Sequence, residues 1–333
     1  MKPTSSLKLS TVLLKQLNLS RNWFYIALTI TLLIGWLAPG VGCQLSRTGI
    51  TPWLVAFAFF LNGFTLSTES LRENAHRWYI ALPAILITFV ISPALVLLAR
   101  MLLPGGHSAL ADGFQLVAAA PTMLVSAVII TRMATGNTTV ALYLTVVNNL
   151  LAILIVPPLL FVTLQLGGVN LRDVSMNLLL TVLLPTIVGQ LANRRWQHVA
   201  LAHARLIGIV SQFSILVFLL LGAVQVPHTR VAPTLLLLIV FACLAHHLFL
   251  LLLGDMAGRL LRCDSPTRHA LAFCSAQKSI AIITLLVQSL FVPLGPAFGI
   301  AALPGIIYYV TELIFDSLLA QWWARKSLVS SEQ

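Results

Sequence analysis

Long runs of apolar residues alternate with short polar gaps along the whole chain. Crossing about 30 Å of hydrocarbon takes about 20 consecutive apolar residues in a helix, and ten runs come near that length or exceed it. None of the gaps is long enough to hold a soluble domain. The pattern predicts an all-α polytopic membrane protein with ten transmembrane helices. These helices are expected at residues 22–40, 50–67, 78–102, 110–133, 138–165, 174–193, 204–226, 231–254, 268–292 and 297–324.

Composition supports the same class. Of the 333 residues, 59% are hydrophobic and only 9% are charged, whereas a soluble domain carries about 25% charged residues. The four cysteines show no paired or metal-type spacing, and we expect them to be free thiols. The lipid bilayer is therefore the expected environment, with the bacterial inner (cell) membrane as the expected location.

The net charge of +11 comes from basic residues scattered through the gaps. With the N-terminus inside, fifteen of the twenty Lys and Arg residues fall on the cytoplasmic side, four fall outside, and Lys278 falls within a span. This bias predicts that both termini are cytoplasmic. No basic patch with interleaved aromatic residues occurs, so nucleic acid is not an expected partner.

Two distant segments of the chain resemble each other. Ser-Ala-Val-Ile-Ile-Thr at 126–131 lies in the fourth predicted span, and Ser-Ile-Ala-Ile-Ile-Thr at 279–284 lies in the ninth. Two halves of five spans each must enter the membrane in opposite directions, which is the inverted repeat of secondary transporters. The expected organisation is a cytoplasmic N-terminal segment at 1–21, a single transmembrane domain at 22–326 with repeats at about 22–165 and 174–326, and a cytoplasmic tail at 327–333.

The fourth and ninth spans are interrupted by polar and small residues. The fourth contains AAAPTMLVS at 118–126, where Pro121 removes a backbone donor and clashes with the preceding turn. The ninth contains CSAQKS at 274–279, without a proline. Unsatisfied backbone at membrane depth is tolerated only where it lines a cavity or is buried in protein. Both spans are therefore expected to be discontinuous helices.

The order of several short motifs resembles the bile acid:sodium symporter family. These motifs are FFLNGFTLS at 59–67, Gly136-Asn137 after the fourth span and FCSAQKS at 273–279. The F-C-x-x-x-K-S pattern of the last motif is similar to that of the family's SBF-like branch. The resemblance covers nearly the whole chain. It implies a panel domain and a core domain, with the fourth and ninth helices unwound and crossed in the core.

The sodium-binding residues of that family are only partly present. The resemblance implies partial ligands at Thr145, at Gln277 and, where the family has a third-span glutamine, at Thr88. The family's ninth-span glutamate and asparagine correspond to Phe273 and Lys278. The loss of a carboxylate and the gain of an ammonium put sodium coupling in doubt. Sodium and the proton both stay candidate coupling ions, and no other cofactor is expected.

Lys278 is the basic residue that falls within a predicted span. An ammonium at membrane depth costs about 3 kcal/mol on insertion scales, and such residues usually mark a substrate or ion path. Glu312 and Asp316, one helical turn apart in the tenth span, are the candidate counter-ions. The ammonium either replaces a bound cation or attracts an anionic substrate; the structural alternative is an ion pair that only orients the ninth helix. The other residues expected along the path are Gln277, Ser279, Ser275, Ser126, Thr122, Thr145, Asn148 and Asn149.

Some polar residues within the spans leave alternatives open. Asn148 and Asn149 are equally consistent with hydrogen bonds between helices. His246 and His247 are adjacent, hence about 100° apart on a helix, and make a poor metal pair. We expect them to pack or to hydrogen-bond, with a proton relay as the alternative role.

The sequence as a whole predicts a secondary transporter of a small organic anion that works by alternating access. A membrane regulator or scaffold on the same fold is the alternative function. An intramembrane enzyme is a weaker alternative, because no H-E-x-x-H, nucleophile elbow or phosphate-cradling glycine loop occurs. The sequence does not determine the substrate or the oligomeric state.

Overall fold

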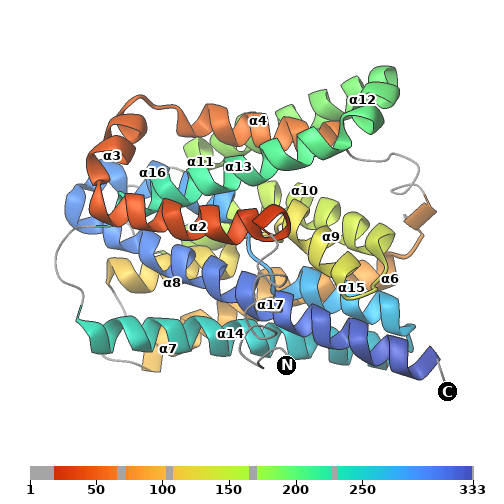
Figure 1. The fold of residues 1–333 in the computed structure, drawn as a ribbon. Helices are drawn as coiled ribbons and strands as arrows, with labels where there is room; N and C mark the ends of the chain where they lie inside the picture. Colours follow the sequence, from red (N-terminus) through yellow and green to blue (C-terminus); the bar gives the residue numbers. More distant parts are fainter. Residues whose placement is uncertain are drawn as a thin grey trace, which may run out of the picture.

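The computed structural model describes residues 19–65, 73–74, 76–102, 108–164, 171–226 and 232–331, and every regular element among them is helical (Figure 1). The N-terminal segment expected at 1–21 lies mostly outside these residues. The elements in chain order are α2 (Leu19–Leu37), α3 (Pro39–Arg47), α4 (Thr51–Phe64), α6 (Trp78–Leu86), η1 (Ile87–Ile91), α7 (Ser92–Leu102), α8 (Ala109–Ala119), α9 (Leu124–Met133), α10 (Thr138–Thr163), α11 (Leu171–Leu178), η2 (Leu179–Leu183), α12 (Leu184–Ala202), α13 (Ala204–Ala223), α14 (Pro233–Leu260), α15 (Ser265–Ala276), α16 (Ile280–Leu290), η3 (Val292–Leu294), η4 (Pro296–Ala301) and α17 (Ala302–Ser331).

Fewer helices than the predicted ten are long and apolar enough to cross a membrane. Among the described residues there are seven such helices, or eight if the bent pair α8 and α9 counts as one span. The first two predicted spans correspond to shorter apolar stretches, Ile26–Leu37 and α4. The structure therefore establishes an all-helical protein with seven or eight span candidates. At the other end of the chain, α17 continues to Ser331, so helix occupies most of the tail expected at 327–333.

The helices form two layers. In the first layer, α4 packs on α12, and α2 packs on α13. The contact between α4 and α12 is close because glycines stand on both sides of it: a Cβ on Gly63 would lie 2.2 Å from the carbonyl oxygen of Thr186, and one on Gly189 would lie 2.2 Å from that of Phe60. The second layer holds α6 to α10 and α14 to α17, where α14 packs on both α15 and α17 (Figure 1).

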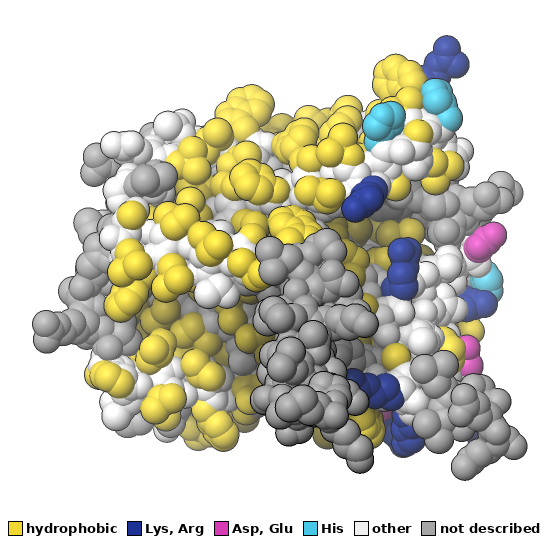
Figure 2. Space-filling model, in the orientation of Figure 1, with side chains coloured by type: hydrophobic (Ala, Val, Ile, Leu, Met, Phe, Trp, Pro, Cys, Tyr) yellow, Lys and Arg dark blue, Asp and Glu magenta, His cyan; other side chains and the backbone are white. Residues whose placement is uncertain are grey.

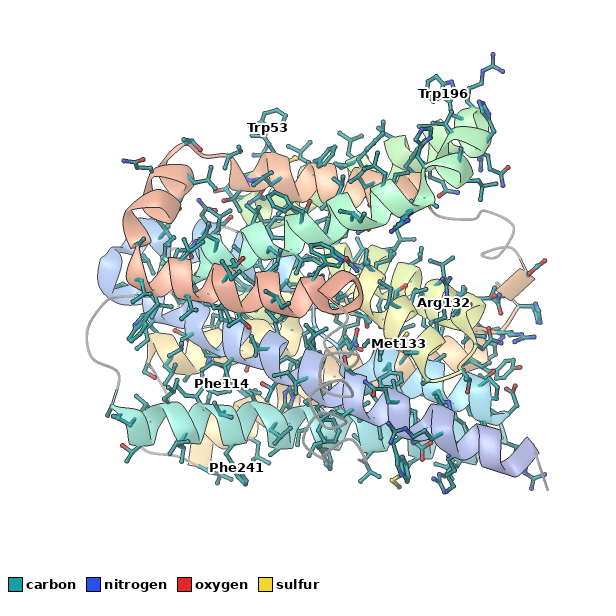
Figure 3. The ribbon with its side chains drawn as sticks, viewed as in Figure 1. Trp53, Phe114, Arg132, Met133, Trp196 and Phe241 are labelled. Atoms are coloured by element: carbon teal, nitrogen blue, oxygen red, sulfur yellow. The ribbon has the colours of Figure 1, made fainter. Side chains whose placement is uncertain are left out.

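The surface has the polarity of a membrane protein. Figure 2 shows a broad apolar belt, with Lys, Arg, Asp, Glu and His side chains gathered at one end of the molecule. Large apolar side chains point outward from this belt, among them Trp53 of α4 and Phe241 of α14, and Trp196 of α12 points outward near the charged end (Figure 3). A face of this kind is stable only in contact with lipid or another apolar surface. The protein is integral to a membrane.

In the part of the chain that the structure describes, two of the long helices contain a π-helical turn. In the third predicted span η1 joins α6 to α7, and in the sixth η2 joins α11 to α12. Pro93 lies two residues after the end of η1, and Pro185 lies two residues after the end of η2. Because proline cannot donate a backbone hydrogen bond and crowds the preceding turn, the helix shifts locally to wider spacing. Such π turns often occur at functional sites, and Thr88 of η1 reaches the site described next.

Candidate functional site

The fourth predicted span is broken where the sequence predicts an interruption. Helix α8 ends at Ala119, α9 begins at Leu124, and the two differ in direction by 63°. Ala120, the residue before Pro121, has ψ 139°, as expected from the steric clash that excludes the helical conformation before proline. The break leaves the last carbonyl groups of α8 without helical donors.

The ninth predicted span is broken at the corresponding place without a proline. Helix α15 ends at Ala276 and α16 begins at Ile280, with Gln277 and Ser279 extended between them. The N–H of Ser279 donates to the carbonyl oxygen of Pro121 at 2.8 Å, and the hydroxyl of Thr122 donates to the carbonyl oxygen of Cys274. The two breaks therefore satisfy part of each other's backbone, which explains why this break needs no proline.

The ammonium of Lys278 lies at this contact among backbone carbonyl groups. Its Nζ is 2.9 Å from the carbonyl oxygen of Ala118, 3.2 Å from that of Ala120 and 3.4 Å from that of Thr88. The side chain is buried, with 1% of the residue exposed. The ammonium thus occupies a cage of three oxygens at the C-terminal end of α8, where the helix dipole favours a cation.

The two carboxylates of α17 do not pair with this ammonium. Oε2 of Glu312 accepts the backbone N–H of Lys278 at 3.0 Å, and Oδ2 of Asp316 accepts the side-chain amide of Gln277 at 2.7 Å. Among the described residues, no carboxylate lies within ion-pair distance of the Lys278 Nζ. The expected counter-ions are therefore both present at the break, but in this conformation they hold its backbone and its glutamine.

Gln277 connects this buried cluster to a pocket between the two layers. Its Oε1 accepts the hydroxyl of Ser126 at 2.9 Å, and Ser126 lies on the pocket wall. We call this cavity of about 480 Å³ the interlayer pocket. It is lined by Trp23 and Phe24 of α2, Val125, Ser126, Ile129, Ile130 and Met133 of α9, Gln212 and Ile215 of α13, and Tyr309, Leu313 and Gln321 of α17.

Asn148 and Asn149 of α10 hold the fourth-span break. Nδ2 of Asn148 donates to the hydroxyl oxygen of Thr122 at 2.9 Å and lies 3.5 Å from that of Thr88. Nδ2 of Asn149 donates to the backbone carbonyl groups of Thr122 and Thr145, at 2.9 and 2.7 Å. Both asparagines therefore make hydrogen bonds between helices, and neither lines the interlayer pocket.

Each of the three partial sodium ligands is hydrogen-bonded to another group of the protein. The hydroxyl of Thr145 donates to the carbonyl oxygen of Leu142 on its own helix, Thr88 meets Asn148, and both ends of the Gln277 amide are engaged. Ser275 and Ser279, the remaining path candidates, are buried beside the ninth-span break. In this conformation the oxygen cage in the second layer holds the ammonium of Lys278.

Two residues of this cluster, His247 and Tyr308, were not among the predicted path residues. Nε2 of His247 lies 2.7 Å from Oδ1 of Asp316, and the ring also meets the hydroxyl of Tyr308 at 3.3 Å. The sequence predicts that His247 packs or hydrogen-bonds, with a proton relay as the alternative role, and it gives no signal for Tyr308. Histidine within an apolar run was the available signal. Its partner could not be predicted, because α14 and α17 meet only in the folded protein.

A surface pair lies at the charged end of α14. Nε of Arg259 lies 2.7 Å from Oδ2 of Asp255, and this is the i,i+4 ion pair expected from the sequence. A second arginine, Arg268 of α15, forms an ion pair with Oδ1 of Asp255 at 2.6 Å. These contacts tie α14 to the start of α15. They lie at the end of the helices and contribute nothing to the lining of the interlayer pocket.

Comparison with known proteins places these features in a family. A model of the SBF-like CPA transporter family matches residues 22–325. The probable chloroplastic sodium/metabolite cotransporter BASS4 of Arabidopsis thaliana is 26% identical over 92% of this chain and 73% of its own length. The uncharacterized protein PA2026 of Pseudomonas aeruginosa is 28% identical over 91% of this chain and 93% of its own. Sodium/bile acid cotransporter 7 of Danio rerio is 26% identical, with coverages of 90% and 92%.

The resemblance inferred from the short motifs is thereby confirmed. The family match spans all the predicted membrane segments, including both broken helices. The family is one of transporters, which agrees with a membrane carrier and not with an enzyme. The chain belongs to the SBF-like CPA transporter family.

Proposed function

We propose that the protein is a secondary carrier of a small organic anion that works by alternating access. The interlayer pocket carries this proposal, because it lies between the two layers and its wall includes Ser126, which is hydrogen-bonded to the broken ninth span. Movement of one layer against the other would open this pocket to one side of the membrane at a time. Trp23, Met133 and Gln321 line it near the helix ends that the charge bias assigns to the cytoplasm.

The same proposal includes ten spans in two inverted repeats. Its support is the matching position of the two breaks, one in α8 and α9 and the other in α15 and α16. Discontinuous helices near the midplane, at the interface of two repeats, are the usual substrate-binding elements of secondary transporters. In this scheme the shorter stretch Ile26–Leu37 and helix α4 complete the first repeat of five spans.

Lys278 is assigned the role of a built-in cation. Its three carbonyl ligands would suit a bound metal cation equally well, since hard cations take oxygen ligands. The family position that carries asparagine elsewhere carries the ammonium here, and the glutamate position is the apolar Phe273. A permanent ligand of this kind would keep the two breaks together without a bound metal ion.

Transport assays on reconstituted protein test this function. Proteoliposomes with the wild-type chain should take up one or more compounds from a set of labelled organic anions that includes a bile acid. Lys278→Gln should lose this uptake while the protein remains folded and inserted. Lys278→Arg should rescue it poorly, because a planar guanidinium does not replace a compact ammonium. Lys326→Gln, at an exposed lysine that lies over Trp322, is the matched control and should transport normally.

The alternating mechanism has a separate test. Val125 of α9 and Ile215 of α13 line the interlayer pocket from different layers. Cysteines at both positions, joined by a short bifunctional reagent, should stop counterflow, and each single cysteine should not. Full-rate transport by the crosslinked protein would exclude alternating access. No uptake of any anion by the wild-type protein would favour the regulator or scaffold alternative.

A further inference from the structure

His247 forms a buried pair with Asp316 that the role of Lys278 does not require. Both residues are fully buried, with 0% exposure. The ring of His247 lies between two residues of α17: Nε2 is 2.7 Å from Oδ1 of Asp316, and Nδ1 is 3.3 Å from the hydroxyl oxygen of Tyr308. Each of these two hydrogen bonds needs one donor atom, and the other hydrogen bonds of the partners determine which atom is the donor.

The hydroxyl of Tyr308 determines the hydrogen on Nδ1. This hydroxyl donates to the carbonyl oxygen of Ala276 at 2.8 Å. Ala276 is the last residue of α15, so the break has removed the helical donor of its carbonyl group. Leaving that carbonyl unpaired would cost about 1–3 kcal/mol. Because a hydroxyl has a single hydrogen, the Tyr308 oxygen can only accept from His247, and Nδ1 therefore carries a hydrogen.

The contact on the other side of the ring needs a second hydrogen. Nε2 of His247 and Oδ1 of Asp316 are 2.7 Å apart. Without a hydrogen between them, their lone pairs would repel each other at this distance. The other carboxylate oxygen of Asp316 is already occupied, since it accepts the amide of Gln277. Because imidazole is a stronger base than a carboxylate, we place this hydrogen on Nε2, and a ring with hydrogens on both nitrogens is an imidazolium. The pair thus contains one proton more than a neutral histidine beside a carboxylate.

The charges of the surrounding cluster agree with this proton. Oε2 of Glu312 accepts the N–H of Lys278, and its Oε1 has no hydrogen-bond partner among the described residues. When Glu312 and Asp316 are both ionised, a proton on His247 gives two cations against two carboxylates, and the cluster is neutral. Without it, one carboxylate charge would be buried without compensation, which is costly in a low-dielectric interior.

We propose that His247 is a proton-binding site, held as an imidazolium against Asp316, and that its proton is the coupling ion of the carrier. This inference deepens the proposed function by naming the ion. Release of the proton from Nε2 to water leaves a neutral ring whose lone pair faces Oδ1 of Asp316. The resulting repulsion turns the carboxylate and withdraws the acceptor of the Gln277 amide. Gln277 holds the hydroxyl of Ser126, so the change reaches the wall of the interlayer pocket through two hydrogen bonds.

Other ionisable groups face this pair from the elements packed on α14. On α15, His269 and Cys274 are turned elsewhere, toward the carbonyl groups of Ala134 and Ala141. Neighbouring His246 meets Ser92 of α7. The groups close enough to act electrostatically on the cluster are Tyr308, Glu312 and Asp316 of α17, Lys278 of the break, and His246 and Cys243 of α14.

Nitrogen NMR on the intact protein tests the proton directly. The full chain, with ¹⁵N-labelled histidine rings, is measured in lipid nanodiscs at about pH 9, where an exposed histidine with a pKa of about 6.5 is neutral. One doubly protonated ring should persist in the wild type and in His246→Gln, and should be absent in His247→Gln and Asp316→Asn. Only neutral rings in the wild type, a signal that survives His247→Gln, or a proton detected on Glu312 in its place would overturn the proposal.

Pocket accessibility tests the coupling without any substrate. Ile129 lines the interlayer pocket. A single cysteine is placed at this position in a protein without its native cysteines, and a second variant carries the cysteine at exposed Lys326 instead. The ratio of their maleimide labelling rates reports how open the pocket is. Raising the pH until the His247 signal is lost should change this ratio in the wild type and leave it constant in Asp316→Asn. A ratio with the same pH dependence in both would show that the proton is not coupled to the pocket. Both measurements are independent of whether any anion is transported.

Discussion

The ammonium of Lys278 lies 2.9 Å from the carbonyl oxygen of Ala118, which is 160 residues away in sequence. The contact places the charged end of the ninth-span break on the C-terminal end of α8. It joins the two broken helices by a buried charge, in addition to the backbone hydrogen bond between Ser279 and Pro121. The break in each helix is therefore part of the same structural unit.

Removal of this ammonium should destabilise the protein. In Lys278→Met the carbonyl groups of Ala118 and Ala120 lose their donor, and each buried carbonyl left unpaired costs about 1–3 kcal/mol. We expect the free energy of unfolding to fall by about 2–4 kcal/mol, measured by denaturant titration in mixed micelles. Lys326→Met removes only an exposed cation over Trp322 and should cost less than about 1 kcal/mol. Equal losses in the two variants would contradict the assigned contact.

Asn149 should matter for stability more than its position in an apolar helix suggests. Asn149→Leu keeps a similar shape but removes the donor to the carbonyl oxygen of Thr122 in the fourth-span break. We expect a loss of about 1–3 kcal/mol, measured in the same titration. The adjacent Leu150 is exposed on the surface, so Leu150→Ala is the control and should have a smaller effect. A neutral Asn149→Leu would mean that the break does not depend on this hydrogen bond.

Two glycines on neighbouring helices should respond oppositely to alanine. A Cβ on Gly189 would lie 2.2 Å from the carbonyl oxygen of Phe60, so Gly189→Ala should separate α4 from α12 and lower the melting temperature. A Cβ on Gly208 of α13 would meet nothing within 4 Å, and Gly208→Ala should be neutral or stabilise by up to about 1 kcal/mol through helix propensity. Thermal unfolding monitored by size-exclusion chromatography distinguishes the two. A harmless Gly189→Ala would show that the two helices pack less closely than described.

The topology can be measured in whole cells. Tags at both termini should be accessible only from the cytoplasm, because the basic residues concentrate on that side. Cysteines placed at Arg47 or at His228, which lies outside the described residues, should react with an impermeant reagent from outside. Opposite locations of the two termini would mean an odd number of spans. In that case the two inverted repeats of five would be excluded.

The sequence by itself determined the class of protein and the positions of its irregularities. Apolar runs and scarce charges leave no alternative to a membrane environment, since every such helix must bury its apolar side chains. Pro121 predicts a break in the fourth span because its geometry excludes a regular helix, whatever surrounds it. The order of several short motifs, the last of which ends in Lys278 and Ser279, predicted the family that the family match confirms. All of these signals are local along the chain.

Partners were decided only by the tertiary structure. The ninth-span break has no proline, and its extended residues are stabilised by Pro121 and Glu312 from other helices. For the same reason the sequence placed Glu312 and Asp316 near Lys278 but not the atoms they bind: the ammonium takes backbone carbonyl groups, which have no signature in a sequence. His247 becomes a proton site only because the fold brings Asp316 and Tyr308 to its two ring nitrogens. The direction of each hydrogen bond depends on atoms that the fold brings together from distant helices. The local pattern of residues along the chain therefore does not predict it.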